Sequence, residues 1–184
     1  MIALVLIDVQ LGLQEAHFYG SERNNPNAEI NAGKILEVFR KRNLPVFHVR
    51  HNSSNLESPL HPSKSGNAFH PLVQPMNNEP IFQKSVNSAF IGTPLEDQLK
   101  LKNIEELVIV GLTIEHCVST SVRMAANLGF KVDLISDATA AFDKIGINGQ
   151  KLNADLIHNA ALANLKDEFA TIKNTETILN ELAN

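Results

Sequence analysis

Short apolar runs alternate along this chain with segments in which apolar residues return every three or four positions. The runs are rich in Val, Ile, Leu and Phe, and they span residues 2–7, 45–50, 81–84, 106–111, 130–136 and 169–173. An uninterrupted apolar run is typical of a parallel strand that is covered on both faces. Helical spacing follows these runs at residues 28–43, 93–99, 115–128, 150–165 and 175–182.

This alternation predicts an α/β protein. Strands separated by helices favour a three-layer α/β/α sandwich with a mostly parallel, doubly wound sheet of about six strands. The chain has 184 residues, 43% of them hydrophobic, which is enough for a substantial core. No internal repeat or shift in composition marks a second unit, so we expect a single domain over residues 1–184.

Local signals predict the ends of two helices and one long loop. Thr93 is a candidate N-cap, with Pro94 at the first helical position and Glu96 placed to complete a capping box. Gly129 is placed to end the helix that precedes it. Residues 51–80 hold many of the prolines and show no clear period, so we expect this connection to form a pocket wall or lid.

Charge and cysteine content narrow the class of partner and the compartment. The net charge is −4, and acidic and basic residues are interleaved, which argues against a nucleic acid or a membrane surface as partner. The start of the chain lacks a basic segment and contains Asp8, so it does not resemble a signal peptide. A single cysteine, Cys117, excludes an intramolecular disulfide, and we expect a cytoplasmic protein.

Three reactive side chains stand at the ends of predicted strands. Asp8 directly follows the first strand, Lys84 ends the strand at 81–84, and Cys117 follows the strand at 106–111 by a few residues. Ligands of open α/β sheets collect outside the carboxyl ends of the strands. If these strands are neighbours, the carboxylate, the ammonium and the thiol share one crevice.

Each of the three residues also has a purely structural interpretation. A lone cysteine is often a small buried apolar residue, an Asp after a strand is often a cap, and a lysine is usually solvated. Together they make a chemical set, because a helix N-terminus and a lysine favour a thiolate while a carboxylate can accept the thiol proton. We therefore expect a lowered thiol pKa at Cys117 and nucleophilic attack by its sulfur on a carbonyl.

Three stretches carry a resemblance to a known family. They are "LVLIDVQ" at 4–10, "FQKSVNSAFIGTPLEDQLK" at 82–100 and "ELVIVGLTIEHCVSTSVRMAANLGFKVDLISDATA" at 106–140. In this order and spacing they resemble the isochorismatase-like cysteine hydrolases, which include nicotinamidases, N-carbamoylsarcosine amidohydrolases and ureidoacrylate amidohydrolases. The resemblance covers nearly the whole chain. It implies hydrolysis of a C–N bond in a small amide or ureido compound through a thioester.

The resemblance also implies roles for individual residues. Asp8 is the expected general base, Cys117 the nucleophile, and Lys84 the cation that balances their charge. A cis peptide between Leu112 and Thr113 is expected to bring the amides of Thr113 and Cys117 together as an oxyanion hole. Substrate-binding residues are expected at Phe90, Phe18 and Leu13, and Leu13 stands where relatives have Phe. Relatives form dimers and tetramers, so a homo-oligomer is expected.

Metal binding is not expected, although the sequence leaves it open. Nicotinamidases carry a D-x-H metal motif after the second strand, whereas this chain has "FHVRHNSSN" there, without an Asp. Loop histidines at positions His48, His51, His61 and His70 are candidates to gather around a metal, but isolated histidines are more often solvated or bonded to backbone. Arg50 is a candidate partner for a substrate carboxylate, with a structural ion pair as the more common alternative.

Two other functions remain to be weighed. The same fold can serve as a non-catalytic module that binds a small molecule or a partner. A nucleotide-cofactor domain is excluded, because no G-x-G-x-x-G follows the first strand and no phosphate-binding G-x-x-x-x-G-K-[ST] occurs. We therefore expect no cofactor.

Overall fold

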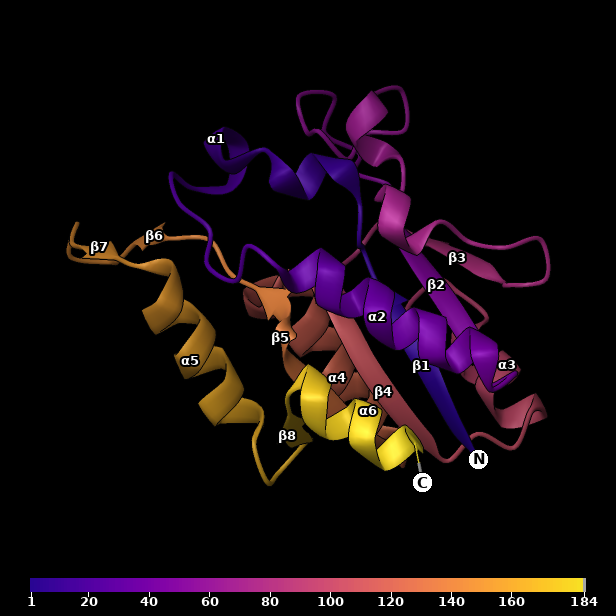
Figure 1. The fold of residues 1–184 in the computed structure, drawn as a ribbon. Helices are drawn as coiled ribbons and strands as arrows, with labels where there is room; N and C mark the ends of the chain where they lie inside the picture. Colours follow the sequence, from indigo (N-terminus) through magenta and orange to yellow (C-terminus); the bar gives the residue numbers. More distant parts are fainter. Residues whose placement is uncertain (184) are drawn as a thin grey trace.

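The computed structural model describes residues 1–183 and has a six-stranded parallel sheet at its centre (Figure 1). The strand order is β3-β2-β1-β4-β5-β8. The bounds of these strands are β1 (Ile2–Ile7), β2 (Val46–His51), β3 (Ile81–Lys84), β4 (Glu106–Leu112), β5 (Lys131–Ala140) and β8 (Thr171–Lys173). A separate antiparallel hairpin pairs β6 (Lys144–Ile145) with β7 (Lys151–Leu152). The doubly wound parallel sheet predicted from the sequence is confirmed.

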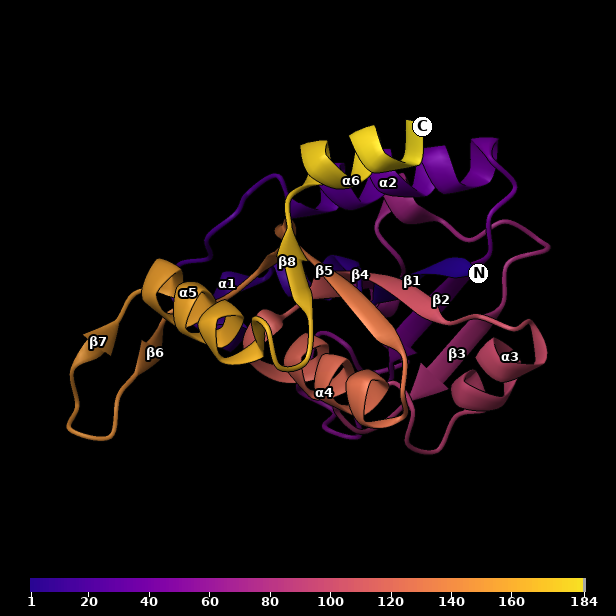
Figure 2. The ribbon, with the colours of Figure 1, turned by 90° about the horizontal axis from the view of Figure 1, so that it is seen from below.

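Helices cover both faces of the sheet, as Figure 2 shows. One face carries α2 (Ala28–Lys41) and α6 (Thr175–Ala183), and the other carries α3 (Leu95–Leu101) and α4 (Ser119–Asn127), with α5 (Ala154–Leu165) packed beside α4. Shorter elements are α1 (Ala16–Tyr19), the 3₁₀ turns η1 (Leu11–Gln14), η2 (Ser65–Asn67) and η3 (Pro71–Val73), and the π-helical turn η4 (Ile114–Val118). Within residues 1–183, no helix has the length and apolar character needed to cross a membrane.

The first strand shows why an uninterrupted apolar run marks a central strand. Ala3, Val5 and Ile7 of β1 pack into the core beneath α3 and α4, while Leu4 and Leu6 pack against the α2 and α6 side. Both sets are almost fully buried. Each fully buried Val, Leu or Ile side chain contributes about 1.5–3 kcal/mol, so a polar residue on either face of the strand would be destabilising.

The predicted starts of α3 and α5 are wrong. The helix at 93–99 begins later, at Leu95, as α3, with Pro94 at the cap position, while the Thr93 hydroxyl donates to the Ala89 carbonyl and accepts from the Leu95 amide. Glu96 pairs with Lys100 one turn along and does not close a capping box. The helix predicted from residue 150 begins instead at α5, because residues 151–152 pair in the hairpin and the Asn153 side chain caps the first turn.

The end of α4 follows the prediction, whereas its start does not. Gly129 has a φ of 92°, in the left-handed region that glycine adopts most easily, and it ends this helix. The first turn at residues 114–118 is a π-helical turn, although the sequence pattern predicts regular helix from Glu115.

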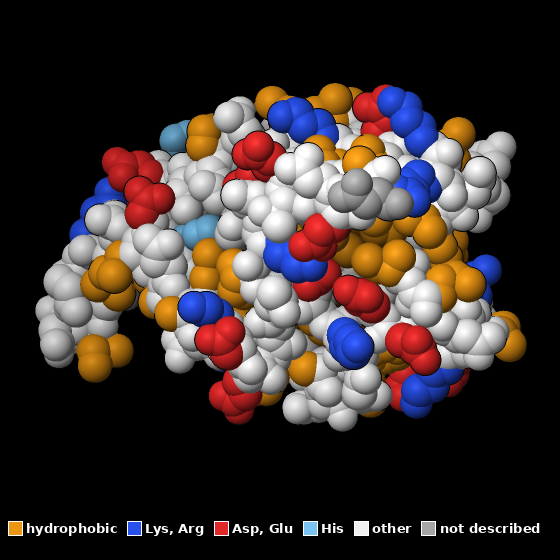
Figure 3. Space-filling model, turned by 60° about the horizontal axis from the view of Figure 1, so that its bottom comes forward, with side chains coloured by type: hydrophobic (Ala, Val, Ile, Leu, Met, Phe, Trp, Pro, Cys, Tyr) orange, Lys and Arg blue, Asp and Glu red, His pale blue; other side chains and the backbone are white. Residues whose placement is uncertain are grey.

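Figure 3 shows acidic and basic side chains interspersed on one face of the molecule, as their order in the sequence predicts.

Candidate active site

The site lies where the strand order reverses, at the carboxyl ends of β1 and β4. Asp8 directly follows β1 and has a φ of 52°, a left-handed conformation that Asp tolerates better than most residues. Its side chain is buried. Two residues on, buried Gln10 accepts from the backbone amide of His51 and donates to its carbonyl, so the ends of β1 and β2 are held together. This local geometry directs the Asp8 carboxylate into the crevice.

Lys84, the last residue of β3, joins the other groups of the site. Its fully buried Nζ donates to Asp8 Oδ2 at 2.6 Å and to Cys117 Sγ at 3.2 Å, and it lies 3.1 Å from His51 Nδ1. An ammonium has three N–H groups, and here it meets three acceptors. Asp8, Lys84 and Cys117, which the sequence places at three separate strand ends, are therefore in direct contact through one nitrogen.

Cys117 lies in the π-helical turn that follows β4. Gly111 allows β4 to come close to β1, because a Cβ at this position would lie 2.0 Å from the Ile7 carbonyl oxygen. The peptide bond between Leu112 and Thr113 is cis. The Cys117 thiol also contacts Asn87 Oδ1 at 3.8 Å, and Asn87 follows β3 along the chain.

The electrostatics of the resting site differ from the sequence-based expectation. Burial raises the pKa of the Cys117 thiol, the Asp8 carboxylate raises it further, and the opposing effect of Lys84 is too small to compensate. The expected lowering of the thiol pKa is thus wrong, because burial and a nearby carboxylate both penalise the thiolate. The resting sulfur is a neutral thiol, and it would have to lose its proton to act as a nucleophile.

The protonation states of Lys84 and His51, the two side chains beside the thiol, follow from their surroundings. Burial alone would lower the pKa of Lys84, but the charge of Asp8 and the hydrogen bonds to Asp8 and Cys117 outweigh it and raise that pKa, which keeps the ammonium charged. Burial and the Lys84 charge lower the pKa of His51. His51 is therefore neutral near pH 7, and the contact with Lys84 assigns the lone pair to Nδ1.

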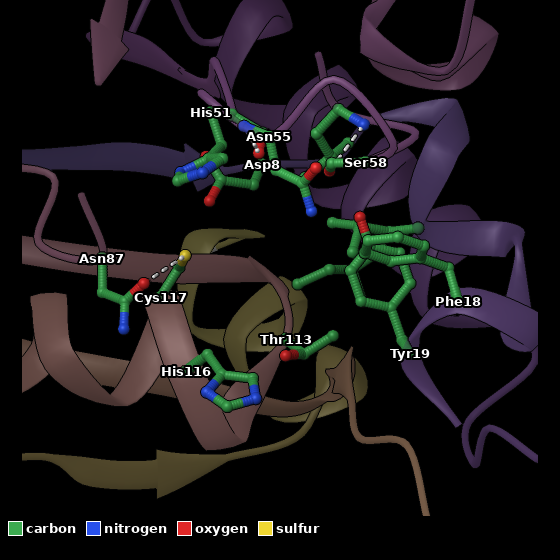
Figure 4. Close-up of a pocket in the computed structure, with 14 residues that line it drawn as sticks. Asp8, Phe18, Tyr19, His51, Asn55, Ser58, Asn87, Thr113, His116 and Cys117 are labelled. Atoms are coloured by element: carbon green, nitrogen blue, oxygen red, sulfur yellow. Dashed lines mark hydrogen bonds between the residues drawn. The ribbon is translucent and has the colours of Figure 1, made fainter. Parts of the chain in front are cut away.

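A cavity of about 300 Å³ opens above the sulfur (Figure 4). In this view Asp8, His51, Asn55 and Ser58 lie at the top, and Thr113 and His116 lie below. Phe18 and Tyr19 lie at the right, across from Cys117 and Asn87. Loop 51–80 contributes part of the wall, as predicted from its composition. The residues that line the cavity are Asp8, Leu13, Phe18, Tyr19, His51, Ser53, Asn55, Ser58, Leu60, Asn87, Leu112, Thr113, His116 and Cys117.

The predicted substrate-binding residues do not all reach this cavity. Leu13 and Phe18 line it, whereas Phe90 does not. The Phe90 ring stacks on Phe130 with 6.3 Å between centroids, so it belongs to the core beside α4. Arg50 also lies outside the lining, with its guanidinium 5.6 Å from the centre of the Phe69 ring. A pairing of Arg50 with a substrate carboxylate is therefore not supported.

The four candidate histidines do not gather around one point. His48 bonds to Glu79 at 2.8 Å, His61 to Ser63, and His70 accepts from the Leu72 amide. Each of these three imidazoles is thus engaged with a separate neighbour. Only His51 reaches the site.

One group within residues 1–183 has the spacing of metal ligands. Donor atoms of Asp8, His51 and Cys117 lie within 4.8 Å of one another. The Lys84 ammonium contacts all three side chains, so a cation already fills the position between them. This set does not fit a resident metal ion, because the ion would have to displace the ammonium.

Sequence reasoning missed several lining residues, and the signal for the most important one was present. His51 ends β2, so the strand-end rule that identified Asp8 and Lys84 applies to it as well. His116 and Tyr19 are neighbours of predicted site residues along the chain. Nothing in the sequence marks Asn87, because it reaches the sulfur only through the path of the loop after β3.

Comparison with known proteins finds similarity over nearly the whole chain. The sequence-family model named isochorismatase domain matches residues 2–177. YrdC, an uncharacterized isochorismatase family protein of Bacillus subtilis (strain 168), is 48% identical over 179 residues, or 97% of this chain and 95% of YrdC. A crystal structure of an isochorismatase-family protein from Chromobacterium violaceum ATCC 12472 has a TM-score of 0.94 at 39% identity, covering 98% of this chain and 93% of that chain. Nicotinamidase 3 of Arabidopsis thaliana is 25% identical, over 98% of this chain and 88% of its own length.

Proposed function

Because the chain belongs to the isochorismatase family of hydrolases, we propose that it cleaves the C–N bond of a small amide or ureido compound through a thioester on Cys117. One observation carries the proposal. The Lys84 ammonium contacts both a carboxylate and a thiol at the wall of a small cavity. A relative named as a nicotinamidase supports an amide as the substrate class.

The first half of the reaction forms an acyl-enzyme. Cys117 Sγ attacks the carbonyl carbon while the thiol proton passes to Asp8, whose Oδ1 is buried and has no hydrogen-bond partner among the described residues. The carbonyl oxygen takes up the electron pair and becomes an oxyanion. When the tetrahedral intermediate collapses, the C–N bond breaks and the nitrogen leaves as an amine or ammonia with the proton from Asp8.

The second half regenerates the thiol. Asp8 accepts a proton from a water molecule, and the resulting hydroxide oxygen attacks the thioester carbon. The S–C bond then breaks, the acid is released, and the proton on Asp8 returns to the sulfur. Each proton that leaves one reactant arrives on another, so the site ends in its starting state.

Lys84 makes this proton movement possible inside the protein. Before attack the buried charges are an ammonium and a carboxylate, and after proton transfer they are the same ammonium and a thiolate. The net charge of the buried set stays zero, and the ammonium contacts the anion in both states. The backbone amides of Thr113 and Cys117 are the proposed donors to the oxyanion, since both residues line the cavity.

A search for the acyl-enzyme tests the proposal. The protein is exposed to a panel of small amides and ureides and analysed by mass spectrometry. We expect an acyl adduct on Cys117 and release of the amine, both abolished in Cys117→Ala. Saturable binding without product, unchanged in Cys117→Ser, would instead support a binding module on the same fold.

A further inference from the structure

Within residues 1–183, no side chain offers the cavity a free positive charge. Neither Lys nor Arg is among its lining residues. The buried Lys84 ammonium directs its three N–H groups at Asp8, His51 and Cys117. Lys144, near the rim, lies 3.5 Å from the Glu115 carboxylate and donates to a backbone carbonyl. A carboxylate that enters this cavity therefore meets no unpaired cation.

The charges around the cavity nearly balance, because Lys84 pairs with Asp8 and Lys144 pairs with Glu115. The Asp8 carboxylate faces the space directly. The charge of Glu15 acts on Tyr19, and the charge of Glu115 acts on His116. Burial lowers the pKa of His116, so this imidazole is neutral near pH 7. An anionic substrate group would be desolvated here without an unpaired cation to bind it, at a cost of several kcal/mol.

An aromatic wall faces the polar side of the cavity. Tyr19 stacks on Phe142 at 5.3 Å and meets the edge of Phe18 at 4.9 Å, so its ring is held in place. Burial raises the pKa of Tyr19 to about 12, which keeps the phenol uncharged. Phe18 is 44% exposed, and a large exposed ring at a cavity mouth is suited to cover an apolar ligand.

We propose that the substrate of this site is an uncharged amide or ureide whose non-reacting part packs against Phe18 and Tyr19, and that compounds bearing a carboxylate are excluded. This inference rests on the proposed hydrolase function and deepens it. In this chain the nearby Arg50 packs on Phe69 and does not face the pocket.

Two alkylating reagents of matched size test the charge selectivity without any turnover. Iodoacetamide and iodoacetate both transfer a two-carbon group to sulfur with loss of iodide, and they differ only in amide against carboxylate. Cys117 is the only cysteine, so labelling reports on this site alone. We expect the ratio of the iodoacetamide rate to the iodoacetate rate at Cys117 to exceed that of a free thiol by about tenfold or more, which corresponds to about 1.4 kcal/mol of discrimination.

A charge-insertion variant and a matched control locate the effect. Asn55→Lys places an ammonium at the cavity wall and should bring the rate ratio back toward the free-thiol value. Asn77→Lys makes the same chemical change on an exposed turn outside the lining and should leave the ratio unchanged. A free-thiol ratio in the unmodified protein would overturn the inference. An Asn55→Lys ratio equal to that of the unmodified protein would also overturn it.

Substrate tests separate this inference from the proposed function. If no amide acylates Cys117, the hydrolase proposal fails while the labelling ratio still reports the charge selectivity. If carboxylate-bearing amides are hydrolysed with a kcat/KM equal to or above that of their uncharged analogues, the hydrolase proposal stands and this inference fails. We expect the kcat/KM of the uncharged analogues to be about tenfold or more higher, which corresponds to the same free-energy difference of about 1.4 kcal/mol as in the labelling test.

Discussion

Replacing Asp8 by Asn should make the thiol of Cys117 more reactive and at the same time abolish turnover. Asp8 is the second largest cause of the raised thiol pKa, after burial, so removing its charge lowers that pKa. Asn keeps the size of the side chain and an oxygen that can accept from Lys84, and it tolerates the left-handed backbone at this position. The variant loses the proton acceptor that the proposed reaction needs.

The geometry sets the size of the effect. The carboxylate oxygen and the sulfur lie within 4.8 Å of each other. At an effective dielectric constant of about 20, two negative charges at this distance repel by about 3.5 kcal/mol, or about 2.5 pKa units. Water in the cavity screens part of this, so we expect a fall of about 2 pKa units and about 100-fold more thiolate at pH 7. A less basic thiolate is less nucleophilic by about tenfold, which leaves a net gain of about tenfold in the alkylation rate.

The assay is the rate of carbamidomethylation by iodoacetamide between pH 6 and 10, followed by mass spectrometry. The unmodified protein should react more slowly at pH 7 than a model thiol, because its thiol pKa is raised. Asp8→Asn should react about tenfold faster than the unmodified protein. Glu57→Gln serves as the control. It also removes one negative charge, but from an exposed position in loop 51–80, which forms part of the cavity wall.

An Asp8→Asn rate equal to or below that of the unmodified protein would refute this reasoning, provided that circular dichroism and thermal unfolding show a folded variant. Such a result would mean that burial alone controls the thiol. Retained hydrolysis by Asp8→Asn would separately contradict the assignment of Asp8 as the base.

Three further predictions concern the buried charges. Lys84→Met leaves Asp8 buried without its cation and should lower the free energy of unfolding in urea by about 3–5 kcal/mol, whereas the double variant with Asp8→Asn should recover much of this loss. His51→Ala removes one acceptor of the Lys84 ammonium and should lower kcat by about tenfold or more, since a hydrogen bond to a charged group contributes about 1.5–3 kcal/mol; an unchanged kcat would show that two acceptors suffice. Although burial opposes it, hydrogen bonds from Arg40, a backbone amide and an imidazole lower the pKa of Glu79 to about 2. Its stabilising effect is therefore complete above about pH 4.5 and is lost as the pH falls toward 2, so Glu79→Gln should remove about 3 kcal/mol at pH 7 and much less at pH 2 in urea unfolding.

The sequence by itself determined the layers of this protein and pointed to three side chains that meet at the candidate site. The apolar run at Ile2–Ile7 predicts a strand covered on both faces, because each of its side chains must be removed from water. The rule that parallel strands present their carboxyl ends at one edge then selects Asp8 and Lys84 from positions 76 residues apart. The rule also applies to His51, the last residue of β2, although from the sequence alone this residue is considered only as a candidate metal ligand.

Only the tertiary structure decided what these groups are at rest and which residues surround them. A pKa depends on burial and on charges within a few ångströms, and neither can be read from spacing, so the raised thiol pKa of Cys117 was predicted with the wrong sign. Phe90 and Phe18 look equally suited to a pocket in the sequence, yet one ring packs on Phe130 and the other lines the cavity. Side-chain direction is set by the path of the loop that carries the residue, and long-range packing determines that path.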